Sequence, residues 1–277
     1  MDPVRPEFVP DPSLSRAEME SLQRDIADAA AFTDDLPFDS ANVGVGDDAP
    51  ATTGEQTQTR LDDTAGAVTD RADPPLIAGV DQAFVDDRAV SVIVCLRGDE
   101  VVERVHAVEP VEIPYVPGLL SFREGGAIVS AFAELSTDPD LAVFDGSGRI
   151  HFRQAGLATH LGVTFGVPAV GVAKNLLCGR PRESLDRKLS AGARVPIEAD
   201  SEVTAPDGTV IGHALQTRQF ESGDRYINPL YVSPGHRVSA ETTADLVERC
   251  CDGYKLPEPT RLADGYADEV KADLRGT

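Results

Sequence analysis

The segment Asp145-Gly-Ser-Gly-Arg-Ile-His151 combines residue types that suit metal-assisted chemistry on a large substrate. It follows Leu141-Ala-Val-Phe144, a short apolar run typical of a buried strand. A carboxylate at the carboxyl end of such a strand faces the crevice where open α/β sheets bind ligands. The glycines allow a sharp turn and the close approach of another molecule. Alone, the segment also fits an ordinary turn, because Asp-Gly commonly follows a strand.

Two further acids accompany Asp145. Asp81 interrupts the apolar run that begins at Ile77, where an unpaired carboxylate is costly. Glu124 stands in the first turn of a predicted helix. If the strands that carry Asp81 and Asp145 pair, the three carboxylates meet at one edge and form a site for a hard cation such as Mg²⁺. Such an ion activates water and neutralises the leaving oxygen in phosphodiester cleavage. Two structural alternatives stay open: Glu124 caps its helix, and Asp81 lies at a bulge or sheet edge.

The elements that must position these acids follow from periodicity and turn signals. The predicted strands cover 76–84, 90–96, 100–108, 141–144 and 169–173, with two short strands around Val203 and 210–218. The predicted helices cover 13–31, 121–135, a part of 155–165 and 240–251, with Ser121 and Ser239 as N-caps and Glu124 in a capping box. Three antiparallel strands followed by alternating helix and strand indicate an α/β fold, a mixed sheet flanked by helices.

Composition restricts the setting of the protein. The 277 residues contain no apolar run near the roughly 20 residues that a membrane helix needs, and the first residues lack the apolar core of a signal peptide. The four cysteines form no CxxC pair, so we expect reduced thiols that fill apolar space in the cytoplasm. The length allows one large domain or two small ones, with a sizeable core.

The charge is strongly acidic. The chain has 47 Asp and Glu residues against 25 Lys and Arg residues, and its formal net charge is -22. Such a chain repels nucleic acid at modest salt. In concentrated salt, where the Debye length is about 3 Å at 1 M, the repulsion is screened and the carboxylates keep the protein hydrated. The composition is typical of a halophilic protein, so the charge reports the solvent rather than the ligand.

Seven segments, taken together and in order, resemble the endonuclease V family. They are Ala78-Gly-Val-Asp-Gln-Ala-Phe84, Pro114-Tyr-Val-Pro-Gly-Leu-Leu-Ser-Phe-Arg-Glu124, Asp145-Gly-Ser-Gly-Arg-Ile-His-Phe-Arg153, Gly156-Leu-Ala-Thr-His-Leu-Gly162, Gly171-Val-Ala-Lys174, Asn228-Pro-Leu-Tyr-Val-Ser-Pro-Gly-His-Arg-Val238 and Gly253-Tyr-Lys-Leu-Pro-Glu-Pro-Thr-Arg-Leu-Ala-Asp264. The resemblance covers residues 75–264. It implies an N-terminal helix within 1–32 that packs on the domain, an acidic flexible insertion or linker at 33–73, and a catalytic domain at 74–277.

The resemblance also implies an RNase H-like fold and a metal-dependent endonuclease of DNA repair. Such an enzyme recognises hypoxanthine, the deaminated form of adenine, and hydrolyses the second phosphodiester 3′ to it. Mg²⁺ is the expected cofactor, with Mn²⁺ as a substitute, and the expected partner is DNA, or RNA, that contains inosine. We expect a monomer without a membrane partner. The alternatives are an inosine-specific ribonuclease and a non-catalytic binder of modified nucleic acid, because fold does not fix function.

Roles carry over position by position. Asp81, Glu124 and Asp145 match the metal-binding acids, and His151 and Lys174 match a histidine and a lysine of the active site. Tyr115, which lies between two prolines, matches the residue that the family uses as a strand-separating wedge. Gly118, Leu120 and Gly146 match positions that line the base pocket. His236 matches a further substrate-binding position. The chain departs from the family pattern at Phe152, usually proline, and at Gly125-Gly126. We expect His160 to be a hydrogen-bonded structural histidine.

Overall fold

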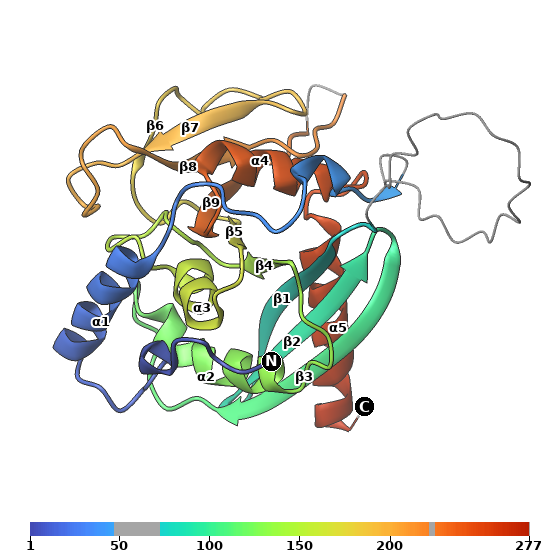
Figure 1. The fold of residues 1–277 in the computed structure, drawn as a ribbon. Helices are drawn as coiled ribbons and strands as arrows, with labels where there is room; N and C mark the ends of the chain where they lie inside the picture. Colours follow the sequence, from blue (N-terminus) through green and yellow to red (C-terminus); the bar gives the residue numbers. More distant parts are fainter. Residues whose placement is uncertain (47–72, 222–224, 277) are drawn as a thin grey trace, which may run out of the picture.

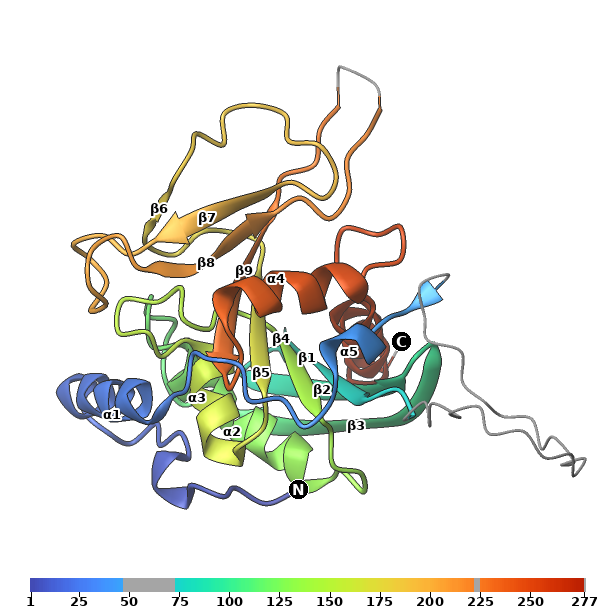
Figure 2. The same cartoon turned by 45° about the horizontal axis from the view of Figure 1, so that its top comes forward.

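The computed structural model describes residues 1–46, 73–221 and 225–276. These residues build a nine-stranded sheet with helices on both faces (Figures 1 and 2). The strands run β3-β2-β1-β4-β5-β9-β8-β7-β6 across the sheet. Their bounds are β1 (Leu76–Val85), β2 (Arg88–Arg97), β3 (Glu100–Pro110), β4 (Leu141–Asp145), β5 (Ala169–Ala173), β6 (Arg180–Pro181), β7 (Arg194–Glu198), β8 (Val210–Leu215) and β9 (Leu230–His236). The predicted mixed α/β sheet is confirmed.

Alternate residues of the strands feed cores on opposite faces of the sheet. On one face, Ala78 and Val80 of β1 join the cluster that contains α2 (Leu120–Ala133) and α3 (Leu157–Phe165). On the other face, Ile77 joins the cluster beneath α4 (Ala240–Arg249). Helix α5 (Glu258–Arg275) covers the neighbouring part of that face, where its Ala263 and Ala267 pack against β2. The central strands are therefore buried on both sides, as their near-continuous apolar sequences require.

The pairing of β1 and β4 decides where the acids lie. The two strands are parallel, with Val80 opposite Phe144. Asp81 and Asp145 follow directly in their strands and therefore meet at the same edge, as predicted. Strand β5 extends the parallel part of the sheet and places Val172 beside Asp145.

Helix α1 (Arg16–Ala29) lies outside α2 and α3 (Figure 1). It begins with a capping box in which the Ser15 hydroxyl accepts from the Glu18 backbone N–H and the Glu18 carboxylate accepts from the Ser15 backbone N–H. Met19 and Ile26 are buried, as their helical spacing predicts. Short 3-10 turns at Pro6–Phe8 and Ser40–Asn42 flank α1 in the sequence.

The chain after α1 is packed before it reaches the acidic segment. Val43 and Val45 are buried, and the Asp34 carboxylate accepts a 2.6 Å hydrogen bond from the Ser239 backbone N–H at the start of α4. Asp35 forms an ion pair with Arg237 at 2.8 Å. The flexible insertion predicted for 33–73 therefore does not begin at residue 33. Residues 47–72 of that prediction lie outside the described residues.

Four local predictions were wrong or incomplete. Helix α2 begins one residue before Ser121, so this serine is inside the helix and bonds His160 instead of capping, and Glu124 makes no capping box. The residues around Val203 form a turn, and the strand lies earlier, at β7. Strand β9 and helix α5 were not predicted as elements, because prolines at 229, 234, 257 and 259 interrupt their patterns. By contrast, Ser239 caps α4 as predicted.

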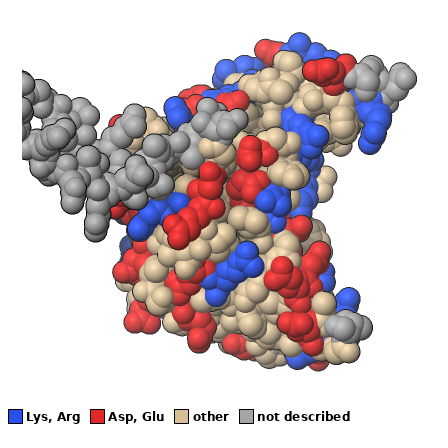
Figure 3. Space-filling view, turned by 90° about the vertical axis from the view of Figure 1, so that its right-hand side faces the viewer, with Lys and Arg blue, Asp and Glu red and all other residues tan. Residues whose placement is uncertain are grey.

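The described residues include no helix that is long and apolar enough to cross a membrane. All four cysteines are free thiols, and Cys95, Cys178 and Cys250 are buried, as expected. Figure 3 shows one face of the molecule, on which acidic side chains form several patches among fewer basic ones. This surface matches the net charge of -22.

Candidate active site

A cavity of about 460 Å³ opens beside the carboxyl ends of β4 and β5. This volume suits a small ligand such as a nucleobase with part of its sugar. Seven of the ten predicted site residues line it: Tyr115, Gly118, Leu120, Asp145, Gly146, His151 and Lys174. Gln23 of α1 and Ser121 of α2 line it as well. Asp81, Glu124 and His236 do not.

Asp81 and Asp145 are close enough to repel each other. Asp81 is buried, and burial together with the charge of Asp145 raises its pKa to about 7. Asp145 is half-buried and faces the cavity. Two carboxylates on neighbouring parallel strands, one of them deprived of water, form a pair that favours a bound cation or proton.

Glu124 approaches the same pair from α2. It is buried, and burial is the main reason that its pKa rises to about 7, with Asp145 adding repulsion. The Asp264 carboxylate of α5, which the sequence analysis did not single out, also raises the pKa of Asp81. Asp264 ends the last segment that resembles the family, and this position could have marked it as a candidate site residue. In the described part of the chain, no three His, Cys, Asp or Glu side chains are already arranged to hold a metal ion.

Lys174 supplies the positive charge of the site. Its ammonium donates to the Asp145 Oδ2 atom at 2.9 Å. Burial favours the neutral amine, but the carboxylate of Asp145 outweighs it and raises the pKa of Lys174. Half of the side chain remains exposed, so the ammonium is accessible to an anion that enters the cavity.

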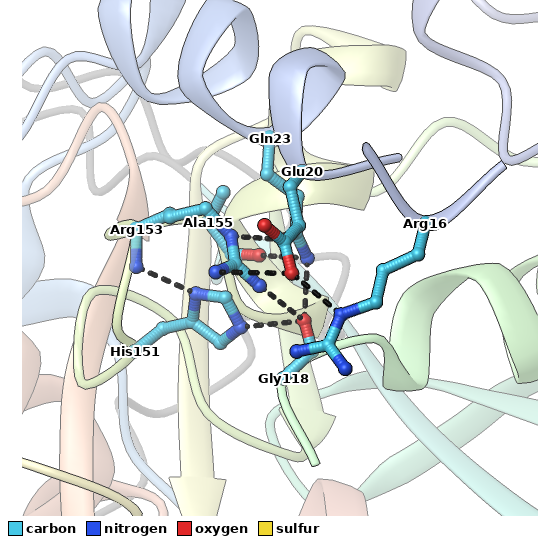
Figure 4. A network of polar contacts seen from close by, with 7 residues as sticks. All are labelled: Arg16, Glu20, Gln23, Gly118, His151, Arg153 and Ala155. Atoms are coloured by element: carbon cyan, nitrogen blue, oxygen red, sulfur yellow. Dashed lines mark hydrogen bonds and ion pairs between the residues drawn. The ribbon is translucent and has the colours of Figure 1, made fainter. Parts of the chain in front are cut away.

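The carbonyl oxygen of Gly118 anchors the loop that forms one wall of the cavity (Figure 4). It accepts hydrogen bonds from Gln23 Nε2 at 2.8 Å, His151 Nε2 at 3.0 Å and Arg153 Nη2 at 3.4 Å. The Arg153 Nε atom also donates to Gln23 Oε1 at 2.7 Å. Gly118 has φ +81, and a Cβ there would meet the Phe152 ring at 3.0 Å, so glycine is required. The sequence pattern placed Gln23 in a predicted helix and gave no sign that it contacts the pocket.

Both ring nitrogens of His151 are engaged. Its Nδ1 accepts from the Arg153 backbone N–H at 3.1 Å, so its Nε2 carries the proton that it donates to Gly118. Burial lowers the pKa of His151 to about 4. The ring is therefore neutral and fixed, and in this arrangement it holds the Gly118 loop in place.

Tyr115 contrasts with this buried network. It is 63% exposed at the rim of the cavity, on the loop that Gly118 anchors. A large aromatic ring beside a base-sized cavity is free to stack on a nucleobase.

Two further histidines lie away from the cavity. His236 pairs with Ala169, at the opposite end of β5 from Val172 and Asp145, and its Nδ1 accepts from the Ala31 backbone N–H at 3.2 Å. Its position does not support the predicted contact with substrate, because it ties the chain after α1 to the sheet. His160 is buried and bonded to Ser121 and the Phe8 carbonyl, as expected of a structural histidine.

Comparison with known proteins identifies the family. A family model described as Endonuclease V matches residues 59–265, which is more than half of the chain. The chain belongs to the endonuclease V family. An endonuclease V of the halophilic archaeon Haloarcula marismortui is 68% identical over 98% of both chains, and one from Gloeobacter violaceus is 40% identical over 70% of this chain. The protein is therefore a nuclease of the hydrolase class, in a family of metal-dependent nucleases, and its composition fits the halophilic relatives.

Solved structures agree with this assignment. The endonuclease V of Streptomyces avermitilis matches with a TM-score of 0.71 and 28% identity over 98% of both chains. The Ciona intestinalis endonuclease V, crystallised with a DNA that contains inosine followed by a ribo-adenosine, matches with a TM-score of 0.67 and 21% identity over 93% of this chain and 98% of that one. The RNase H-like α/β fold is confirmed by these neighbours.

Proposed function

We propose that this endonuclease recognises inosine in DNA and hydrolyses the second phosphodiester 3′ to it, as a step of DNA repair. The observation that carries the proposal is the junction of the base-sized cavity with Asp145 and Lys174, which line its wall. A base held in the cavity places its own strand beside these charges. The inosine-containing DNA bound by the Ciona relative supports the same substrate.

Glycines and apolar residues form part of the base pocket. Gly118, Leu120 and Gly146 contribute main chain and small or apolar surface, and such a wall admits a flat purine. Extruding a base from a duplex costs a few kcal/mol, and an inserted side chain offsets part of this. We assign that wedge role to Tyr115, because it is exposed at the rim of the pocket.

Asp81, Glu124 and Asp145 are the residues that would hold Mg²⁺, or Mn²⁺ as a substitute. The donor set fits, because hard cations bind carboxylate oxygens and because burial, together with the charge of Asp145, raises the pKa values of Asp81 and Glu124 to about 7. When bound, the ion supplies an activated water and charge neutralisation at the phosphate. Side-chain movement is needed first, since the carboxylates are not yet grouped around one point.

The cationic and neutral side chains have separate tasks in this proposal. Lys174 binds a non-bridging oxygen of the scissile phosphate. Its ammonium then contacts both this oxygen and the Asp145 carboxylate. His151 keeps the pocket loop in place through Gly118 and does not transfer a proton, because both of its nitrogens are occupied. We further propose that the enzyme acts as a monomer in the cytoplasm.

The test is a cleavage assay in concentrated KCl with Mg²⁺, with matched strands that contain one inosine in DNA or in RNA. We expect cleavage of the DNA at the second phosphodiester bond 3′ to the inosine. A control strand that carries adenosine in place of inosine should not be cleaved. Asp145→Asn should abolish cleavage and keep inosine-dependent binding. Binding by the wild type without cleavage would favour the non-catalytic alternative, and cleavage of the RNA alone would favour a ribonuclease.

A further inference from the structure

A second cavity, of about 490 Å³, lies between two loops outside the candidate active site. One wall is the loop 185–189, and the other is formed by residues between β8 and β9, namely Gln216, Gln219 and residues 226–229. Its volume is within the range of small-ligand sites. No predicted site residue lines it.

Two glutamines stabilise the walls of this cavity. Gln219 donates to the Leu189 carbonyl at 3.1 Å, and its Oε1 accepts from the Ile227 backbone N–H at 2.9 Å. Gln216 donates to the carbonyls of Arg218 at 2.6 Å and Ile227 at 3.0 Å. Gln219 therefore joins the two loops, and Gln216 braces its own loop, so the cavity is preformed.

One buried acceptor in the wall has no donor. Gln216 is 1% exposed, and its Oε1 atom makes no hydrogen bond. The orientation of its amide is fixed, because its nitrogen faces two carbonyl oxygens. An unsatisfied buried acceptor is rare in folded proteins.

The rim of the cavity carries an aromatic ring and cations. Tyr226 is 71% exposed, which is more than the wedge candidate Tyr115. Arg187 and Lys188 line the same cavity, with Asp186 as the one carboxylate among the lining residues. Arg187 also contacts Glu183 at 2.7 Å, but both side chains are exposed and such a pair is weak. An arginine beside an exposed aromatic ring suits a phosphate with a stacked base.

The sheet places this cavity on the same edge as the active site. Strand β9 is antiparallel to β5, with Tyr231 opposite Ala173, so Asn228 and Pro229 lie at the edge where β4 and β5 end. Neighbouring strands are about 4.8 Å apart, so β9 and β8 lie about 10–14 Å from Asp145 across the sheet. At the roughly 3.4 Å per nucleotide of one strand in a DNA duplex, this distance corresponds to three or four nucleotides.

We propose that this second cavity binds a nucleotide of the substrate strand a few positions 3′ to the scissile bond, with Tyr226 stacked on its base and Arg187 near its phosphate. The inference rests on the proposed function: a strand whose base occupies the first cavity passes Lys174 at the end of β5, and β9 is the next strand of the sheet at that edge. The contacts do not depend on base identity, since they use a ring face and a phosphate.

The test varies the length of DNA on each side of the lesion. In one series, single strands with one inosine and a fixed 5′ flank would carry two, four, eight or twelve nucleotides beyond the scissile bond. A second series would keep the 3′ flank fixed and vary the 5′ flank over the same lengths. For the wild type we expect KM to fall about tenfold between two and eight nucleotides and then to stay constant. Tyr226→Ala should remove this gain and leave the KM of the shortest strand unchanged. Tyr254→Ala, which changes a 51% exposed tyrosine outside the cavity, should behave as the wild type.

The outcomes separate the two proposals. Cleavage with a KM that is independent of the 3′ flank, or a gain that persists in Tyr226→Ala, would overturn the second site and leave the proposed function intact. A gain on the 5′ side that depends on Tyr226 would overturn the assigned direction. Absence of inosine-dependent cleavage at every length would overturn the proposed function and this inference with it.

Discussion

Gln23 donates a hydrogen bond of 2.8 Å to the carbonyl oxygen of Gly118, a residue 95 positions later in the chain. The contact joins α1, which lies outside the sheet, to the loop that carries Tyr115 and forms a wall of the base pocket. Figure 4 shows that Arg153 closes the network by contacting the same glutamine and the same carbonyl. The N-terminal helix therefore takes part in positioning the pocket.

Gln23→Ala should weaken the recognition of inosine more than it weakens the fold. The change removes a donor from Gly118 and an acceptor from Arg153, and each hydrogen bond contributes about 0.5–1.5 kcal/mol. We expect KM for an inosine strand to rise about fivefold with a smaller change in kcat, measured beside thermal unfolding. Asp25→Ala, on the exposed side of the same helix, is the matched control and should change neither. An unchanged KM in Gln23→Ala would remove the positioning role.

Tyr115→Ala should impair cleavage of duplex DNA more than cleavage of single strands. A wedge is needed most where a base leaves a stack, and stacking on an aromatic ring contributes about 1–3 kcal/mol. Relative kcat/KM on matched single- and double-stranded inosine substrates measures the effect. Equal losses on both would assign Tyr115 a purely structural role.

The buried histidine His160 should make folding sensitive to acid. Burial lowers its pKa to about 4 from 6.5, so its contribution to stability is present above about pH 6.5 and is lost as the pH falls toward 4. Unfolding by urea at several pH values would compare the wild type with His160→Gln. The difference in the free energy of unfolding between the wild type and His160→Gln should shrink between pH 6.5 and 4. The reason is that the buried His160 ring must stay uncharged in the folded wild type, whereas glutamine does not titrate. Asp81 and Glu124 act in the opposite direction, but they are common to both proteins and cancel. A pH-independent difference would contradict the assignment.

Folding and cleavage should both improve from dilute buffer toward molar KCl. A net charge of -22 destabilises the compact chain and repels the DNA backbone, and salt screens both effects. A salt titration of cleavage rate beside circular dichroism tests this. Full activity in dilute buffer that only declines with KCl would refute the halophilic interpretation without affecting the nuclease assignment.

The sequence predicted the elements whose patterns are local and strong. Apolar runs located β1, β4 and β5. The sequence raised the pairing of the strands that carry Asp81 and Asp145 only as a condition, and the structure shows that they pair and are parallel. The two N-caps predicted from the same rules had different outcomes. Ser239 caps α4, but the Ser121 hydroxyl is hydrogen-bonded to His160. This contact joins two elements that are distant in the sequence, so local spacing does not encode it.

Contacts between distant segments account for the remaining differences. Gln23 and Asp264 reach the site from helices far from it in the sequence, and an amide or an acid on a helix is usually a surface residue. His236 occupies a family-like segment, but antiparallel pairing of β9 carries it to the far end of β5. Motif order alone does not reveal which end of a strand a residue occupies.

Helix α5 follows all strands of the sheet in sequence and lies against β1, the strand that carries Asp81. During translation, β1 and β4 leave the ribosome well before residues 258–275 are made. Until then the nascent chain lacks the cover over this part of β1, and Asp264 has not joined the electrostatic surroundings of Asp81. The order of synthesis therefore delays completion of the acidic site until the last described helix has been made.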